Sequence, residues 1–193
     1  MTENNTIRVY RLVDPSIIYL NADKIAYHFF GMPQLQVKNK NFSVDTNNGF
    51  FTYTDHSQIF TDYVKSKLPQ NADEAQKAAD SFMLRANALI QNESFFLNQS
   101  FPLLFSNLRF TGAKSVGHPE KRWIDHWEVI YQGYVKPNNN KGDILVFDSK
   151  VSFLIGGNNQ IISLMYNWLP ISDFELFELT SSTYKKVIYA IED

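Results

Sequence analysis

The chain has 193 residues, of which 44% are hydrophobic and 15% aromatic, enough apolar material for one large domain or two small ones packed together. A formal net charge of −2, with Lys and Arg scattered along the chain, excludes the positive field on which nucleic-acid-binding proteins depend. The absence of cysteine excludes disulfides, thiolate metal sites and cysteine nucleophiles together.

Two further patterns concern membrane-spanning segments and the cellular compartment of the protein. No apolar run reaches the roughly 20 residues of a transmembrane helix, so no membrane span is expected. The start, Met1 to Asn5, lacks the charged and apolar regions of a signal peptide. A short polar leader that runs directly into a strand is also what removal of an anchor would leave. We therefore expect an extracytoplasmic or membrane-anchored protein whose anchor is absent from this chain, with a cytoplasmic protein as the alternative.

The first third of the chain predicts the order β-α-β-β. Alternating residues over 7–13 favour a strand, which Asp14-Pro15 ends. Asn21 is a typical N-cap residue, so we expect a helix over 22–31 that ends at Gly31. Alternation over 42–53 around Asn47-Asn48-Gly49 then predicts a tight hairpin.

A second Asn-Ala-Asp triplet begins the next predicted helix. Asn71 is its expected N-cap, and an apolar stripe rich in alanine extends it over 72–90. Small residues let a helix lie close to a sheet, so this helix should pack on one. Residues 92–100 are expected to form a loop.

The remaining chain is mostly predicted strand. Strands are expected over 103–110, 123–135, 142–155 and 160–168, with turns at 112, 137–141 and 156–159, and a last helix over 183–191. The predicted fold class is α+β, in two helix-plus-antiparallel-sheet units, β-α-β-β (1–66) and α-β-β-β-β-α (67–193). The helices should pack on one face of the antiparallel sheets, with both units in one compact body.

Several short motifs resemble the PepSY-type domains of bacterial envelope proteins. The helix carries Asp73-Glu74-Ala75 with Ala79 and Phe82, and a strand carries Trp127, Val129 and Tyr131 in the pattern W-x-V-x-Y. Further on come V-x-F-L-I-G-G-N-N-Q-I-I-S-L from Val151, W-L-P-I from Trp168 and L-T-S-S-T-Y-K-K-V from Leu179. The resemblance implies a pair of PepSY-like or cystatin-like units, usually extracytoplasmic and sometimes inhibitory toward peptidases.

The densest group of titratable residues surrounds the predicted strand 123–135. Alternation places His126 and Glu128 on one face, toward solvent. It places Trp123 and Trp127 on the other face, which is buried. With His118 from the preceding loop, these residues form an alternative site for a cleft-bearing enzyme or small-ligand carrier. A polar sheet face is the simpler interpretation. Four histidines, no cysteine and no compact ligand spacing predict no tight metal site, and no cofactor or catalytic residue is expected.

Aromatic residues in predicted loops suggest a binding role. Phe95, Phe96, Phe174 and Phe177 have no core position in the strand and helix patterns, so they are candidate binding residues on an exposed apolar surface. The leading hypothesis is a non-enzymatic binding or interaction module with a protein or peptide partner. The sequence defines neither that partner nor the oligomeric state.

Overall fold

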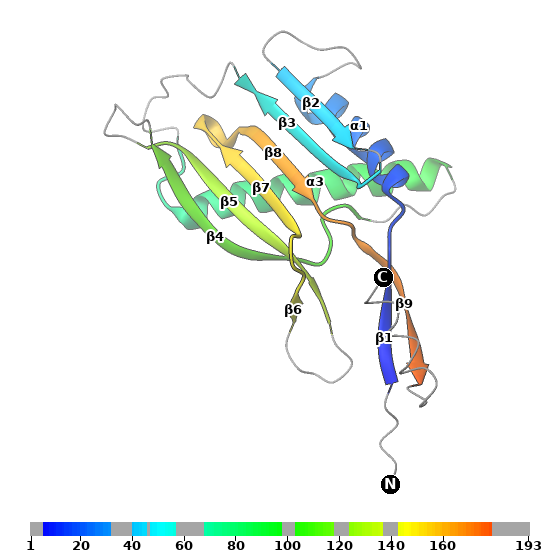
Figure 1. Cartoon of the computed structure of the whole chain (residues 1–193). Helices are drawn as coiled ribbons and strands as arrows, with labels where there is room; N and C mark the ends of the chain where they lie inside the picture. Colours follow the sequence, from blue (N-terminus) through cyan, green and yellow to red (C-terminus); the bar gives the residue numbers. More distant parts are fainter. Residues whose placement is uncertain are drawn as a thin grey trace.

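The computed structural model describes residues 6–31, 40–45, 47–56, 68–97, 103–117, 124–136 and 143–178. Within these ranges the chain forms a large antiparallel sheet, a separate two-stranded ribbon and two long helices (Figure 1). The predicted α+β class is therefore confirmed. None of the helices in these ranges is both long enough and apolar enough to cross a membrane.

The large sheet draws on both halves of the chain. Its order is β2 (Lys40–Asp45), β3 (Phe50–Asp55), β8 (Ile161–Asn167), β7 (Lys150–Ile155), β5 (Ile124–Val135) and β4 (Leu108–Gly117), with β6 (Ile144–Leu145) paired to β5. Every neighbouring pair is antiparallel. Because β3 pairs with β8, the strands of the two predicted units form one continuous sheet. The boundary between 66 and 67 stays a prediction.

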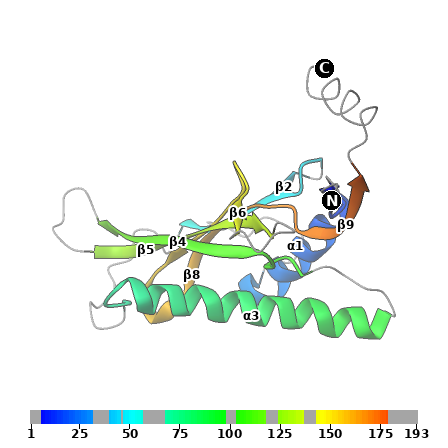
Figure 2. The ribbon, with the colours of Figure 1, turned by 90° about the horizontal axis from the view of Figure 1, so that it is seen from below.

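Both helices lie on the same face of the sheet (Figure 2). Helix α1 (Pro15–Phe30) contacts β2 and β3, whereas α3 (Ala72–Leu97) contacts β4, β5 and β7. Ala75, Ala79 and Ala86 of α3 are fully buried, as expected of small residues that let a helix approach a sheet closely. On β3, Phe51, Tyr53 and Asp55 face the helices and are buried. The other face of the sheet carries no helix among the described residues.

The start of α1 differs from the prediction. The helix begins at Pro15, not after Asn21, because proline is well suited to the first helical turn, where its missing N–H is not needed. Asn21 is therefore not an N-cap but a fully buried residue in mid-helix, and its side-chain amide has no hydrogen-bond partner among the described residues. Asn71, in contrast, accepts a 2.9 Å hydrogen bond from the N–H of Glu74, as an N-cap should. The two Asn-Ala-Asp triplets thus have different structural roles.

The end of α3 also differs from the prediction, since the helix continues past Ile90 to Leu97. The predicted loop over 92–100 is therefore wrong at least as far as residue 97. The predicted last helix over 183–191 lies outside the described residues.

Two predicted strands have different bounds in the structure. Gly112 does not form a turn but lies inside β4, at a register shift opposite Ile130. The predicted strand 142–155 is two strands, β6 and β7, separated by a turn in which Asp148 has a positive φ of 57°. The Asn47-Asn48-Gly49 hairpin and the turn over 156–159 are confirmed.

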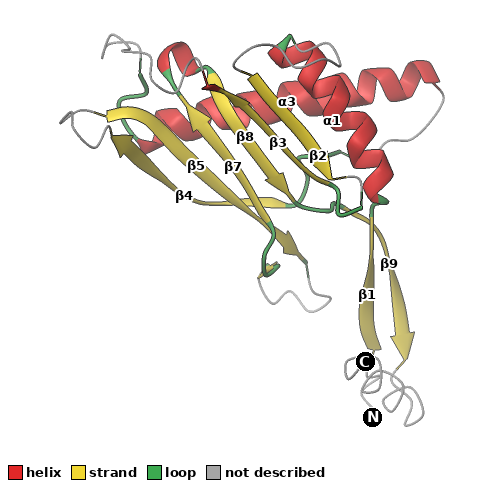
Figure 3. Cartoon of the chain, turned by 45° about the horizontal axis from the view of Figure 1, so that its top comes forward, coloured by secondary structure: helices red, strands yellow, loops and turns green. Residues whose placement is uncertain are grey.

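The ribbon projects from the main body (Figures 1 and 3). It consists of β1 (Thr6–Leu12) and β9 (Ile171–Glu178), paired antiparallel. Strand β9 was not expected from the sequence, which predicts a loop around Phe174 and Phe177. The hydroxyl of Tyr10 donates a 2.6 Å hydrogen bond to the carbonyl of Lys136, so the ribbon is attached to the end of β5.

Candidate binding surfaces

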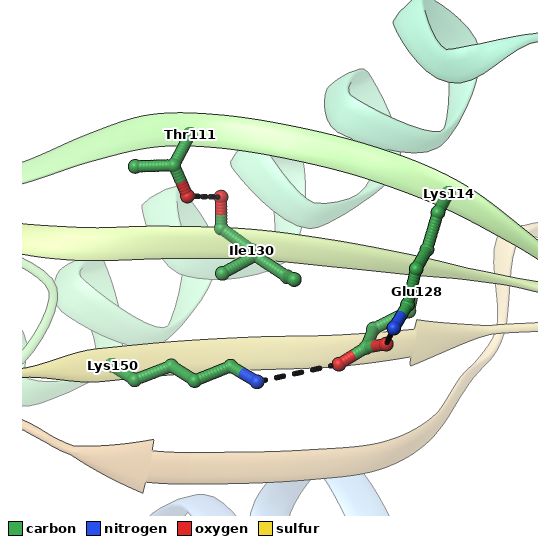
Figure 4. A network of polar contacts seen from close by, with 5 residues as sticks. All are labelled: Thr111, Lys114, Glu128, Ile130 and Lys150. Carbon is green, nitrogen blue, oxygen red and sulfur yellow. Dashed lines mark hydrogen bonds and ion pairs between the residues drawn. The ribbon is translucent and has the colours of Figure 1, made fainter.

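An ion-pair network occupies the helix-free face of the sheet (Figure 4). Glu128 on β5 lies between Lys114 on β4, at 2.7 Å, and Lys150 on β7, at 3.5 Å. Partial burial acts to raise the pKa of Glu128, but the hydrogen bonds and charges of the two lysines outweigh it and hold the pKa below its ordinary value. Glu128 is thus a cross-strand ion-pair partner on a mixed polar surface.

His126 is buried, whereas the sequence predicts that it faces solvent. Only 3% of its surface is accessible. It pairs with Val116 near the start of β5, next to a register shift between Val116 and Gly117, and strand alternation alone does not determine exposure at such a shift. His118 lies outside the described residues, so convergence of His118, His126 and Glu128 stays a prediction. The described ranges contain no cluster of three or more residues suited to hold a metal ion.

The four phenylalanines predicted to lie in loops belong to regular elements. Phe95 and Phe96 are in the last turns of α3. Phe174 and Phe177 are in β9, paired with Tyr10 and Ile7 of β1. The expectation of loops is therefore wrong, because the helix and the ribbon are longer than the sequence pattern indicates. Their side chains lie outside what the structure describes, so their binding role stays a prediction.

The structure instead has an apolar groove at the base of the ribbon. Its volume is about 500 Å³. Its lining comes from β1, the β2–β3 turn, the end of β5, the β6–β7 turn and the end of β8, with the side chains of Leu12, Asn48, Val135, Val146, Phe147, Asp148, Ser149, Asn167, Trp168 and Leu169. Two of the apolar residues are strongly exposed, Leu12 at 53% and Phe147 at 87%.

The β6–β7 turn that carries Phe147 is fixed by hydrogen bonds on both sides. The hydroxyl of Ser149 donates to the carbonyl of Val146 at 2.7 Å and accepts a 2.9 Å bond from the N–H of Gly133. The side-chain amide of Asn167 donates to the carbonyl of Asp148 at 2.9 Å. Phe147 is therefore displayed on a turn that its neighbours hold in place.

The floor of the groove is part of the core. Trp168 is buried, and its indole N–H donates a 3.0 Å hydrogen bond to the carbonyl of Ser106. Leu169 packs against Gly49, whose positive φ of 67° suits glycine and whose missing side chain leaves room for the leucine. The groove thus has a fixed floor and a protruding rim.

A second hollow, the aromatic cavity, lies on the helix-bearing side. Its volume is about 320 Å³. It is lined at the end of α1, along α3, on β3 and at the β7–β8 turn by Phe29, Phe30, Tyr53, Phe82, Arg85, Asn158, Asn159, Gln160 and Ile161. The rings of Phe30 and Tyr53 are stacked, with centroids 3.5 Å apart, and the guanidinium of Arg85 lies over Phe29 at 5.5 Å.

Tyr53 remains a neutral phenol in this cavity. Burial and then the charge of the nearby Asp55 raise the pKa of Tyr53 to about 12. Its hydroxyl therefore keeps its proton throughout the physiological range and can donate a hydrogen bond.

Sequence reasoning missed both hollows. Phe147 was placed inside a continuous strand over 142–155. The dipeptide Asp148-Ser149, which is typical of turns, was the available signal. The aromatic cavity has no comparable signal, because its residues come from four separate segments.

Comparison with known protein families, curated proteins and solved structures found no match to this chain.

Proposed function

We propose that this protein is a non-enzymatic binding module, and that the apolar groove takes an apolar side chain from an extended segment of a partner protein. The observation that carries the proposal is Phe147, which is 87% exposed on the rim of the groove while its turn is held by hydrogen bonds. A large aromatic side chain left in water gives up the free energy that its burial would contribute, about 1.5–3 kcal/mol. Burial against a partner would recover this free energy.

The shape of the groove suits this partner. Leu12 and Phe147 form exposed apolar walls, and the buried Trp168 forms the floor. Interfaces commonly concentrate their binding energy in a few aromatic anchors that border a well-packed pocket. Little reorganisation is needed before binding, because the floor belongs to the core and the rim is a hydrogen-bonded turn.

Polar groups at the rim favour an extended peptide segment over a purely apolar compound. Asn48, Asp148 and Asn167 lie among the apolar lining residues. Their side chains offer donors and acceptors to the main chain of a segment whose apolar side chain enters the groove. This arrangement resembles a hot spot surrounded by polar contacts.

The test is a selection of linear peptides from a random display library on the intact protein. Selected peptides should share an apolar anchor residue and should bind the wild-type protein with measurable affinity in calorimetry. Phe147→Ala should weaken their binding at least about tenfold, equivalent to 1.4 kcal/mol or more. Leu84→Ala is the matched control, since Leu84 is 72% exposed on α3 and does not line the groove.

Two results would contradict the proposal. One is a set of selected peptides that bind the wild-type protein and Phe147→Ala equally well. The other is concentration-dependent dimerisation in analytical ultracentrifugation that Phe147→Ala abolishes, which would assign the groove to a second copy of this chain.

A further inference from the structure

The aromatic cavity has the features of a small-molecule site separate from the groove. Its walls are rings from three elements, Phe29 and Phe30 of α1, Tyr53 of β3 and Phe82 of α3. The ring of Phe82 lies 5.0 Å from that of Phe29 and 5.8 Å from that of Phe30, so the wall is a packed aromatic surface. Phe30, Tyr53 and Phe82 are buried, so a ligand would meet this wall chiefly at the half-buried Phe29. A flat, apolar ligand body suits such an aromatic wall. The volume of about 320 Å³ suits a ligand of one or two fused rings.

The polar groups of the cavity favour an anion. Arg85 supplies a positive charge, and no Asp or Glu is among the described lining residues, although Asp55 is close enough to Tyr53 for its charge to act on the phenol. In the described part of the chain, the contacts of Arg85 are a long 3.4 Å hydrogen bond from Nε to the carbonyl of Ser81 and its position over Phe29. The guanidinium therefore retains donors that could bind a carboxylate with two parallel hydrogen bonds.

The β7–β8 turn adds three residues with side-chain amides to the lining of the cavity. Asn158 and Asn159 both have positive φ, 56° and 58°, which is uncommon for residues other than glycine. The main chain of the turn bonds to itself, from the N–H of Gly156 to the carbonyl of Gln160 at 2.9 Å and from the N–H of Gln160 to the carbonyl of Gly157 at 3.2 Å. Asn158, Asn159 and Gln160 line the cavity, and the hydrogen bonds that close the turn are main-chain bonds.

We propose that the aromatic cavity binds a small planar aromatic carboxylate. The ring lies against the aromatic wall, the carboxylate accepts hydrogen bonds from the guanidinium of Arg85, and the turn amides complete its polar environment. The proposal is independent of the partner-binding groove, because the described lining residues of the two hollows are all different.

The experiment uses two probes that differ only in the anionic group. 2-Naphthoate and its neutral amide, 2-naphthamide, are titrated into the full chain and followed by calorimetry. Wild-type protein should bind the carboxylate with a saturable isotherm and at least tenfold more tightly than the amide. Arg85→Gln should reduce carboxylate affinity at least tenfold and leave amide affinity within twofold. Lys77→Gln, an exposed cation on the same helix that does not line the cavity, should leave both affinities unchanged.

A second variant tests the turn without altering its conformation. Asn159→Gly keeps the left-handed backbone at low cost and removes one amide, so carboxylate affinity should fall about threefold or more. Circular dichroism melts verify that every variant is folded. Equal affinity for the two probes, no saturable carboxylate binding below 1 mM as an order-of-magnitude limit, or unchanged affinity in Arg85→Gln would each overturn the proposal.

Discussion

The side-chain amide of Asn87 on α3 forms hydrogen bonds with both main-chain groups of Phe105. Its Nδ2 donates to the carbonyl of Phe105 at 3.1 Å, and its Oδ1 accepts from the N–H of Phe105 at 3.1 Å. One side chain thus satisfies a half-buried piece of main chain that precedes β4. Phe105 is held where its ring packs against Phe82 and Phe153 in the core.

Loss of this double hydrogen bond should destabilise the fold. Asn87→Ala leaves the N–H and carbonyl of Phe105 without partners, so we expect the free energy of unfolding to fall by about 1–3 kcal/mol. Urea denaturation followed by circular dichroism measures the change. Asn92→Ala, at an exposed position on the same helix, should remain within about 0.5 kcal/mol of wild type. Equal effects of the two variants would show that the Phe105 contact does not stabilise the protein.

The contact between Gly133 and Trp168 provides a test of packing. A Cβ at Gly133 would overlap the indole ring, lying 2.7 Å from Cδ2 and closer still to two other ring carbons. Gly133→Ala should therefore displace Trp168 and cost about 1–3 kcal/mol, with an altered tryptophan fluorescence spectrum. Gly112→Ala on the adjacent β4 is the matched control, because a Cβ there meets nothing within 4 Å. Similar destabilisation by both variants would show that the clash with Trp168 is not its cause.

The two Asn-Ala-Asp triplets should respond in opposite ways to mutation. Asn21→Leu replaces a fully buried, unpartnered amide with an apolar group of similar size, so the free energy of unfolding should rise by about 1–3 kcal/mol. Asn71→Ala removes an N-cap and should lower it by about 1 kcal/mol. Thermal and urea melts of the two variants measure the sign of each change in the free energy of unfolding. A destabilised Asn21→Leu protein would mean that the amide of Asn21 is hydrogen-bonded in solution.

The Glu128 network should make stability depend on acid pH. Because the pKa of Glu128 is lower in the folded protein than its ordinary value of 4.5, its ion pairs stabilise the fold above that value. The contribution is lost as pH falls through the folded pKa. At pH 7, Glu128→Gln should cost no more than about 1 kcal/mol, since the pairs are near the surface.

Urea melts at pH 7 and at pH 3 provide the measurement. The difference between wild type and Glu128→Gln should shrink at the lower pH, where the wild-type carboxyl also becomes neutral. Adding Lys114→Gln to the Glu128→Gln background should cost little more, because Lys114 has then lost its ionised partner. A difference that stays constant with pH would exclude the ion pairs as its source.

Local signals in the sequence were sufficient for the elements that local chemistry determines. The Asn47-Asn48-Gly49 turn forms as expected, and Asp45 caps it by accepting hydrogen bonds from Asn47 and Asn48. The N-cap at Asn71 and the alanine stripe of α3 likewise have the predicted roles. Turn and cap residues act through neighbours a few positions away, so a single sequence contains the relevant interactions.

Elements determined by distant partners could not be predicted in this way. Strand β9 forms because it pairs with β1, which lies more than 150 residues earlier in the chain. Phe174 and Phe177 are therefore in a strand, where the sequence predicts a loop. The residue type of Asn21 predicts an N-cap, whereas Asn21 lies in mid-helix and is fully buried in the folded chain.

The candidate sites depend on tertiary structure to a still greater degree. The sequence by itself determined an α+β chain with ample aromatic content, and it indicated binding through exposed apolar residues as a hypothesis. Only the tertiary structure brought Leu12 and Phe147 into the lining of one groove, and Arg85 and the Asn158-Asn159 turn into the lining of one cavity. Long-range strand pairing and helix packing bring these residues together. The periodicity of one segment does not predict contacts between distant segments.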